Sequence, residues 1–369
     1  MRPKSGLPKR KALRRMPQFQ YGFRDNPNTA AYLNPSLRSS SPRSETWSIL
    51  SMFAGCGGLD LGMLGGFKFL GEEYPVLPFR IVQAYDNDPK AAETYRLNLS
   101  DHISEINLAD ADLSQFPAAA ILTGGFPCQD FSSSGPKVGL AGRRGALYRV
   151  MRDYMALHQP SLVVAENVPF LERLHKGKAL ETILEDFRTV GYHFKVWRVF
   201  CPDFGLPQSR TRLFLIGVRN GLEGFPQMPT PTHAFQHTSI DGAIDDLKGV
   251  DDETIPNQSQ YFVATKATKG AGQGDHKSKK GELAYNVRAN PKARVHFHYA
   301  LTRRLTVREC ARLQSFPDEF VFPHAAGHNI LQIGNAVPPI IGHVVARQLA
   351  AFLEQHVQPS SQRLTSPAV

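Results

Sequence analysis

Short apolar runs alternate with longer segments of helical periodicity from Trp47 onward. Apolar runs of strand length, each ended by Gly or a polar residue, predict strands over 47–53, 80–85, 118–125, 161–166, 194–200 and 212–218. Apolar residues at helical spacing predict helices over 88–99, 146–158 and 178–192. Repeated strand–helix units predict the α/β class, with a mainly parallel sheet covered by helices on both faces.

The alternation stops between about 222 and 300, where Pro, Gly, Thr, His and Lys replace the apolar runs. Helical order returns over 305–316, where Thr306 and Glu309 have the spacing of a capping box. A last amphipathic helix is predicted over 338–356. The chain is therefore expected to have three parts. They are a disordered basic arm (1–44), a main α/β domain (45–221 and 301–369) and a smaller irregular domain (222–300).

The net charge of +10 is concentrated in two segments. Residues 1–44 hold ten Lys and Arg against one acid, and residues 266–312 hold twelve against three. Basic segments on an acidic body indicate a polyanionic partner such as nucleic acid, or else solvated surface. The four cysteines lie far apart without zinc-ligand spacing, which predicts free thiols, a reducing compartment and no metal site. Because no apolar run approaches about 18–20 residues, no membrane span is expected.

A glycine-rich turn, FAGCGGLDLG, follows the first predicted strand at 53–62. Its glycines allow a ligand to approach the backbone closely, and the start of the next helix favours polar or anionic groups. Asp86 ends the following strand, where an acid commonly binds ribose hydroxyls or caps a helix. Because the GxGxxG fingerprint is missing, the pattern favours a nucleoside ligand without a pyrophosphate.

Polar residues also end the later strands, at the same edge of the predicted sheet. Cys128 follows a strand and a Pro turn, so it is either a small buried hydrophobe or an exposed nucleophile. Glu166 and Asn167 end an apolar strand, where burial would raise the pKa of Glu166 and suit it to donate a proton; the alternative is a helix cap. Arg210 and Arg212 alternate at a strand start, where they either clamp an anion or form a solvated face.

An ordered series of motifs resembles the DNA (cytosine-5)-methyltransferase family: FAGCGG, YDND, GGFPCQ, ENV, QSRTR, RRLTVRECARLQSFPDEF and IGNAVPP. The series covers about 48–219 and 301–356, and its variable gap at 222–300 falls where such enzymes place a target-recognition region. The resemblance implies a Rossmann-like fold that binds S-adenosylmethionine. It also implies transfer of the methyl group to C5 of a cytosine in duplex DNA.

The resemblance further implies residues that bind the cofactor. Asp86 would bind the ribose hydroxyls, and Asp112, with Asp110 as its rival, would lie near the adenine amino group. Asn87 stands where many relatives carry a larger side chain against the adenine. The loop that holds the cofactor would comprise Phe53, Gly55, Gly57, Gly58, Asp60 and Leu61. The same pocket would be lined by Pro127, Asn335 and Val337.

At the reaction centre, the resemblance makes Cys128 the nucleophile that adds to C6 of cytosine, because C5 alone is too weak a nucleophile. Glu166 would contact N3 and the amino group, Asn167 lies beside it, and Arg210 and Arg212 would support the target nucleotide. The base must leave the duplex, because C6 is unreachable in the stack. Phosphate contacts are expected among Lys137, Arg143, Arg144, Lys266, Lys269, Arg288, Arg294 and Arg303.

Other functions remain open from the sequence. A tRNA cytosine methyltransferase on the same scaffold would carry similar motifs, and a catalytically silent DNA-binding relative or a Cys-His hydrolase would fit less of the pattern. The compact recognition region resembles a prokaryotic modification enzyme. This predicts a cytoplasmic, nucleoid-associated monomer that acts on double-stranded DNA, with a restriction endonuclease for the same site.

Overall fold

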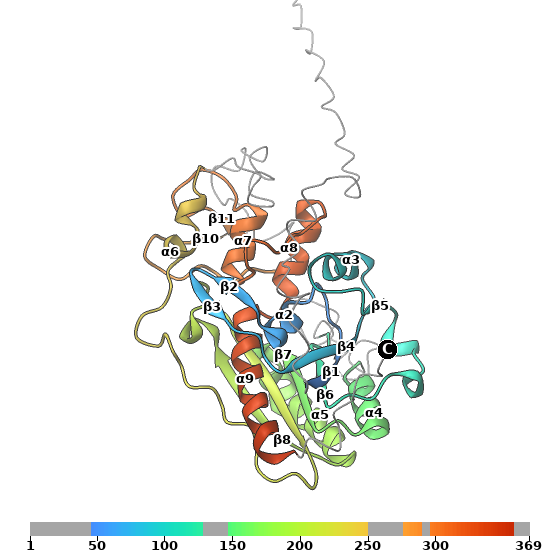
Figure 1. Ribbon diagram of the computed structural model, residues 1–369. Coiled ribbons are helices and arrows are strands. Elements are labelled where there is room, and N and C mark those ends of the chain that lie inside the picture. Colours follow the sequence, from blue (N-terminus) through green and yellow to red (C-terminus); the bar gives the residue numbers. More distant parts are fainter. Residues whose placement is uncertain (1–45, 128–146, 250–275, 290–295, 358–369) are drawn as a thin grey trace, which may run out of the picture.

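A computed structural model describes residues 46–127, 147–249, 276–289 and 296–357. Its centre is a seven-stranded sheet with the order β5-β4-β1-β6-β7-β9-β8 (Figure 1). The strands are β1 (Trp47–Met52), β4 (Phe79–Asp86), β5 (Ile103–Glu105), β6 (Ile121–Gly124), β7 (Leu162–Asn167), β8 (Tyr192–Phe200) and β9 (Thr211–Arg219). The predicted α/β class is confirmed. The predicted arm, 1–44, lies outside the described residues.

The strands β5, β4, β1, β6 and β7 run parallel to one another, whereas β9 runs antiparallel to both β7 and β8. The reversal follows from the length of one connection. β8 ends at Phe200 and β9 begins at Thr211, which leaves no room for the crossover that parallel neighbours need. The prediction of a mainly parallel sheet is therefore confirmed, with one reversed strand.

Helices cover both faces of the sheet. One hydrophobic cluster joins Ile49 of β1 to helices α2 and α9, and a second joins Leu50 to helices α4 and α5. Because the strands are buried on both faces, they are almost continuously apolar. The helices are α2 (Gly58–Leu64), α3 (Pro89–Asn98), α4 (Tyr148–His158), α5 (Lys178–Thr189), α6 (Ile240–Ile244), α7 (Val307–Leu313), α8 (Ala326–Asn335) and α9 (Pro339–His356). The 3-10 helices are η3 (Leu108–Asp110), η4 (Leu113–Gln115), η7 (Pro169–Glu172), η8 (Leu174–Gly177), η9 (Cys201–Phe204) and η10 (Asp245–Leu247).

The first and last of these helices, α2 and α9, pack backbone to backbone. A Cβ on Gly62 would lie 2.4 Å from the carbonyl oxygen of Pro339 and 2.7 Å from Cα of Gly342. Only glycine at position 62 permits this approach. The stretch Ala326–His356 reaches the length and composition of a membrane span. Its most apolar window, however, is 72% buried inside the protein.

Several elements were not predicted. They include β5, α6 and α8, the hairpin of β2 (Phe67–Phe69) and β3 (Glu72–Tyr74), and the two-residue strands β10 (His276–Lys277) and β11 (His296–Phe297). The predicted capping box of α7 is confirmed, since Thr306 and Glu309 cap each other's backbone N–H groups. Within 222–300, Ile244 and Val287 belong to the same core cluster as the main sheet. The division into two domains stays a prediction.

Candidate active site

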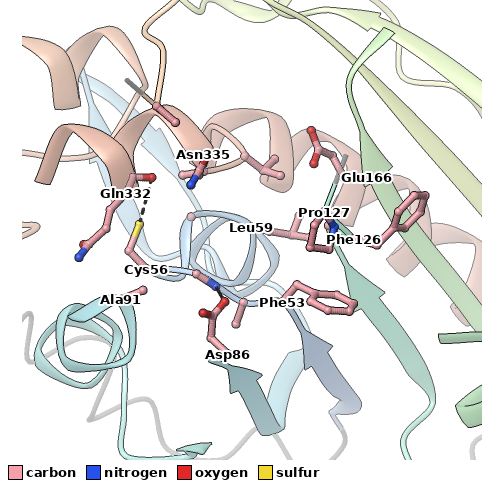
Figure 2. Close-up of a pocket in the computed structure, with 18 of the residues that line it drawn as sticks. Phe53, Cys56, Leu59, Asp86, Ala91, Phe126, Pro127, Glu166, Gln332 and Asn335 are labelled. Carbon is pink, nitrogen blue, oxygen red and sulfur yellow. Dashed lines mark hydrogen bonds between the residues drawn. The ribbon is translucent and has the colours of Figure 1, made fainter. Parts of the chain in front are cut away.

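The carboxyl ends of the strands open into one cavity of about 930 Å³. Ligands of open α/β sheets bind at this edge, and the volume is at the upper end of the range for ligand sites. The walls come from the ends of β1, β4, β6 and β7, the start of β9, the segment 286–289 and the end of α8. In Figure 2, Asp86 and Phe53 lie below α2, and Glu166 lies above Phe126 and Pro127. One cavity thus connects the glycine-rich turn with the predicted reaction centre.

Asp86 holds the glycine-rich turn in place. The N–H of Gly55 donates to its Oδ2 over 2.8 Å, and the N–H of Asp88 donates to its Oδ1 over 2.9 Å. Phe53 and Gly55 both have positive φ, 56° and 57°, a conformation that side chains rarely adopt. Burial raises the pKa of Asp86, and the two N–H groups oppose that shift. The carboxylate is therefore fixed at the cavity wall, with lone pairs left for hydroxyl donors.

The structure brings most of the predicted cofactor residues together. The cavity is lined by Phe53, Gly55, Gly58, Asp86, Asn87, Pro127, Asn335 and Val337. Four predicted residues lie elsewhere: Gly57, Asp60, Leu61 and Asp112. A Cβ on Gly57 would lie 2.4 Å from Leu99, so this glycine packs against α3. Leu61 is in the core cluster, and Asp112 is exposed, where its Oδ1 caps the N–H of Ser114 at 3.1 Å.

Asp60 lies behind the turn in a buried hydrogen-bond network. Its Oδ1 accepts from the Ser51 hydroxyl and its Oδ2 from the Tyr95 hydroxyl, both over 2.8 Å. The Tyr95 oxygen is also 2.8 Å from Nε2 of His102. Burial raises the pKa of Asp60 to about 6, although the hydrogen bonds from Ser51 and Tyr95 oppose the shift. The network joins α2 to β1 and α3 and supports the turn. Asp60 itself does not line the cavity, although its partner Ser51 does.

At the other end of the cavity, Glu166 and Arg212 form an ion pair. Nε of Arg212 donates to Oε1 of Glu166 over 2.7 Å, and both side chains are buried. Burial raises the pKa of Glu166, and the Arg212 and Arg210 guanidiniums oppose that shift. A Cβ on Gly125 would lie 3.2 Å from Oε2 of Glu166, so only glycine leaves this oxygen free of crowding. Asn167 donates to the Phe126 carbonyl over 3.2 Å, which positions the segment leading to Cys128.

Arg210 has a different set of partners from Arg212. Its Nη1 donates to Oδ1 of Asn286 over 2.8 Å and to the carbonyl of Val287 over 3.1 Å. Its Nη2 donates to the carbonyls of Gly334 over 2.9 Å and Ala336 over 3.0 Å. Both terminal nitrogens of this fully buried guanidinium are thus used within the protein. Arg210 joins β9, the segment 286–289 and the end of α8, while Arg212 alone of the two holds Glu166.

Cys128 lies outside the described residues, and Pro127, directly before it, lines the cavity. The cysteines that the structure describes, Cys56, Cys201 and Cys310, are all buried. Burial raises the pKa of both Cys56 and Cys201 to about 12 and that of Cys310 further. These three thiols are therefore poor nucleophiles at neutral pH.

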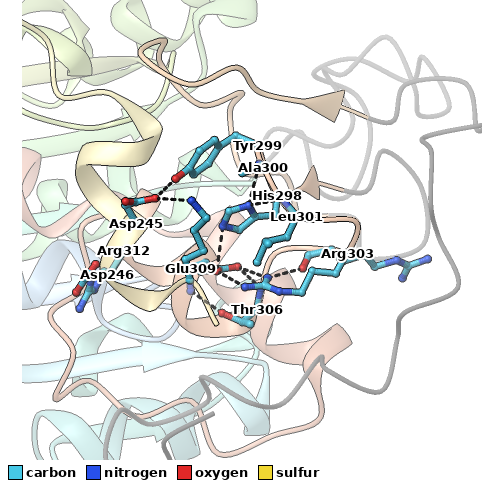
Figure 3. Close-up of polar contacts among 12 residues, drawn as sticks. Asp245, Asp246, His298, Tyr299, Ala300, Leu301, Arg303, Thr306, Glu309 and Arg312 are labelled. Carbon is cyan, nitrogen blue, oxygen red and sulfur yellow. Dashed lines mark hydrogen bonds and ion pairs between the residues drawn. The ribbon is translucent and has the colours of Figure 1, made fainter. Parts of the chain in front are cut away.

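The basic residues predicted to contact phosphates divide into three groups. Lys137, Arg143, Arg144, Lys266, Lys269 and Arg294 lie outside the described residues. Arg303 is buried and donates to both oxygens of Glu309, over 2.7 and 2.8 Å (Figure 3). Its prediction as a phosphate contact is wrong, because its charge is neutralised inside the protein. Arg288 lines the cavity.

Sequence reasoning missed several residues of the cavity wall. Asn107 follows β5, and Leu331 and Gln332 come from α8. The rule that ligands gather at the carboxyl ends of parallel strands would have found Asn107. The strand β5 that precedes Asn107 has only three residues and no apolar run, so the sequence does not reveal where this strand ends.

A mainly parallel sheet with its cavity at the carboxyl ends, an acid at the end of the second sheet strand and a buried Glu–Arg pair defines an enzyme of the Rossmann-like methyltransferase class. The family model "C-5 cytosine-specific DNA methylase" matches residues 47–351. The chain belongs to this family and is a DNA cytosine-5-methyltransferase.

Relatives and solved structures agree with this assignment. The Type II methyltransferase M.NgoFVII of Neisseria gonorrhoeae is 32% identical, and the match covers 82% of this chain and 86% of the relative. The Type II methyltransferase M.BsuRI of Bacillus subtilis is 28% identical, and the match covers 86% of this chain and 82% of the relative. A putative DNA modification methyltransferase from an Escherichia coli prophage has the same fold, with a TM-score of 0.63, 19% identity and coverage of 84% and 100%. The S. pombe Dnmt2 methyltransferase has a TM-score of 0.62 at 19% identity, with coverage of 84% and 99%. The predicted family, fold and enzyme class are confirmed.

Proposed function

We propose that the protein methylates a flipped cytosine in duplex DNA through a covalent bond between Cys128 and C6, with S-adenosylmethionine held at the Asp86 end of the cavity. The observation that carries the proposal is the single cavity, which joins the Asp86 turn to the Glu166–Arg212 pair. Type II names among the relatives support a role as the modification enzyme of a restriction-modification system, with an endonuclease that acts on the same site.

The residues at the Asp86 end fit S-adenosylmethionine. A carboxylate with lone pairs directed at a cavity suits the two neighbouring hydroxyls of a ribose. Phe53 offers an apolar surface, Asn87 and Asn107 offer amides, and Asn335 closes the wall from α8. Asp112 and Asp110 do not line this cavity, so Asn107 is the better candidate for the adenine amino group. When bound, S-adenosylmethionine supplies the methyl group as an electrophile.

Glu166 would hold a proton against N3 of the cytosine. A pKa raised by burial favours the neutral carboxylic acid, which can donate where a carboxylate cannot. Arg212 fixes the rotamer of Glu166 through the 2.7 Å contact. The Cys128 thiolate would bond to C6, which makes C5 electron-rich enough to take the methyl group. A base would then remove the C5 proton, and the electron pair of that C–H bond would re-form the C5–C6 double bond as the bond between Cys128 and C6 breaks. A hydrogen bond at N3 stabilises the negative charge that develops on the ring in between.

The target base must reach this cavity from outside. The strand ends that carry Glu166 and Asn167 are buried, so a base stacked in a duplex cannot contact them. Flipping the nucleotide costs a few kcal/mol, and enzymes that modify a base within a duplex, methyltransferases among them, take the base out of the stack in this way. Because a duplex site can be modified one strand at a time, one copy of the enzyme is enough for the reaction. We therefore propose a monomer, located in the cytoplasm and associated with the nucleoid. A stable dimer in sedimentation without DNA would contradict this state.

The test is transfer of tritium from labelled S-adenosylmethionine to mixed-sequence duplex DNA by wild type, Cys128→Ala and Cys310→Ala. Label at cytosine C5 should appear with wild type and be lost with Cys128→Ala. Cys310→Ala should retain most activity, because this buried thiol lies outside the cavity. Cofactor binding measured by calorimetry shows that each variant is folded. If tRNA is labelled and DNA is not, the substrate is tRNA and the proposal of a DNA substrate is wrong. If the cofactor binds and neither nucleic acid is labelled, the protein is a catalytically silent DNA-binding relative.

A further inference from the structure

The segment 286–289 is clamped onto the cavity by two independent sets of contacts. The carbonyl of Val287 accepts from Arg210, and its N–H donates to Oε1 of Gln208 over 2.8 Å. A Cβ on Gly334 would lie 2.4 Å from the carbonyl carbon of Arg288 and 2.3 Å from the nitrogen of Ala289. The backbone on both sides of the Arg288 side chain is therefore fixed against β9 and α8. A cation mounted this firmly has a defined place in the cavity wall.

The charge of Arg288 is not matched by an acid of the cavity. The acids in the lining are Asp86, Asp88 and Glu166. Asp86 accepts from two backbone N–H groups, Asp88 caps the N-terminus of α3, and Glu166 is paired with Arg212. The half-buried Arg288 guanidinium forms no ion pair or hydrogen bond with another residue in the described part of the chain. Its position therefore suits an anionic group that enters with a ligand.

Other arginines of the basic segment are used inside the protein. Arg303 is paired with Glu309, and Arg308 donates to the carbonyls of Pro317 and Phe320. Arg312, on the same helix α7 as Glu309, is bound by Asp246 and Asp318, and Figure 3 shows Arg303 directed at Glu309. Arg303, Arg308 and Arg312 do not line the catalytic cavity, whereas Arg288 does.

We propose that Arg288 binds a DNA phosphate next to the flipped cytosine. The proposal rests on the proposed function, because only a flipped nucleotide brings its flanking phosphates to the cavity mouth. Arg210 binds Asn286 and Val287, the two residues directly before Arg288. Its near neighbour Arg212 binds Glu166, the residue proposed to face the base. Arg288 is therefore linked through β9 to the place where the flipped base would lie. A planar guanidinium binds a phosphate through two parallel hydrogen bonds. Such a contact positions the nucleotide in the site and also raises the affinity of the enzyme for DNA.

The experiment combines a protein variant with a neutralised phosphate. The duplex carries the target site found by sequencing methylated DNA, and a methylphosphonate replaces the phosphate 5′ or 3′ to the target cytosine. Binding and single-turnover methylation are measured for wild type, Arg288→Ala, Arg288→Lys and the control Arg347→Ala, an exposed arginine on α9 that does not line the cavity. In wild type, neutralising the contacted phosphate should weaken DNA binding roughly tenfold. In Arg288→Ala, which is already weakened by a similar factor, the same neutralisation should have no further effect.

Two further readings complete the test. Arg288→Ala should lower the slope of log affinity against log salt by about 1, and Arg288→Lys should restore part of the affinity. The affinity for S-adenosylmethionine should stay unchanged. Equal sensitivity of wild type and Arg288→Ala to both methylphosphonates would overturn the proposal. So would a loss of cofactor affinity alone, which would place the cofactor carboxylate at Arg288. Failure of the proposed function is read separately, from wild type that neither binds nor labels unmodified duplex.

Discussion

Replacing Asp60 with Asn should stabilise the protein at pH 8 and leave its stability at pH 4 almost unchanged. Asp60 is 1% exposed, and burial raises its pKa from 3.8 to about 6. Between these two values the folded protein retains a proton that the unfolded chain releases. Wild-type stability therefore falls as the pH rises through this window and stays reduced above it. A shift of about two pKa units corresponds to about 3 kcal/mol.

Asparagine can replace the protonated acid without loss of the network. Its Oδ1 can accept from the Ser51 hydroxyl, and its Nδ2 can donate to the Tyr95 oxygen, which can then donate its own hydrogen to Nε2 of His102. The variant therefore avoids the cost of a buried carboxylate at pH 8. For a chain of 369 residues, 3 kcal/mol corresponds to a rise of about 4 °C in melting temperature.

The assay is thermal unfolding of wild type, Asp60→Asn and Glu354→Gln between pH 4 and pH 8. Glu354 is exposed on α9, so its variant should follow wild type within about 0.5 kcal/mol at every pH. The curves of wild type and Asp60→Asn should separate as the pH rises from 4 to 6. Parallel curves, or a less stable Asp60→Asn at pH 8, would refute the reasoning. Cofactor affinity should be unchanged, because Asp60 does not line the cavity.

Three other outcomes are expected. Asp86→Asn should weaken S-adenosylmethionine binding at least tenfold in calorimetry, because charged hydrogen-bond acceptors contribute about 1.5–3 kcal/mol, while DNA affinity stays within twofold. Gly334→Ala should cost about 1–3 kcal/mol in urea unfolding, because its Cβ would lie 2.3 Å from the nitrogen of Ala289; unchanged stability would show that segment 286–289 yields easily. Glu309→Gln should cost about 3–5 kcal/mol by leaving the Arg303 charge buried, and the added change Arg303→Met should recover much of that loss.

Much of the sheet could be predicted because strands buried on both faces are nearly continuous apolar runs. Leu162–Asn167 is such a run, with its polar residues only at the end. Helix α8 could not be predicted, since its sequence AGHNILQIGN contains Gly, Asn and His, and its buried Asn329 and Ile333 depend on tertiary packing. The short β5 likewise gave no pattern.

The site could be predicted as far as positions at strand ends fix it. Asp86 and Glu166 follow apolar strands, and the topology brings both to one edge. The partners of Arg210 could not be predicted, because most of them are backbone carbonyls, two of them in residues more than 120 positions later. Every residue has a backbone carbonyl, so the residue type does not reveal which carbonyl accepts a hydrogen bond. The inward direction of Asp60 was missed for a related reason, since it depends on where α2 packs against Ser51 and Tyr95.

The close packing of α2 and α9 has a consequence for biosynthesis. The cavity wall begins at residues 51–59 and is completed by residues 331–337, so the contacts that close it join segments more than 270 residues apart. Contacts of such large sequence separation form slowly, and they require α8 and α9 to have left the ribosome. The nascent chain should consequently acquire its ligand site only after these two helices have been synthesised. Prematurely terminated products that lack α9 should be inert on DNA and unable to compete for S-adenosylmethionine.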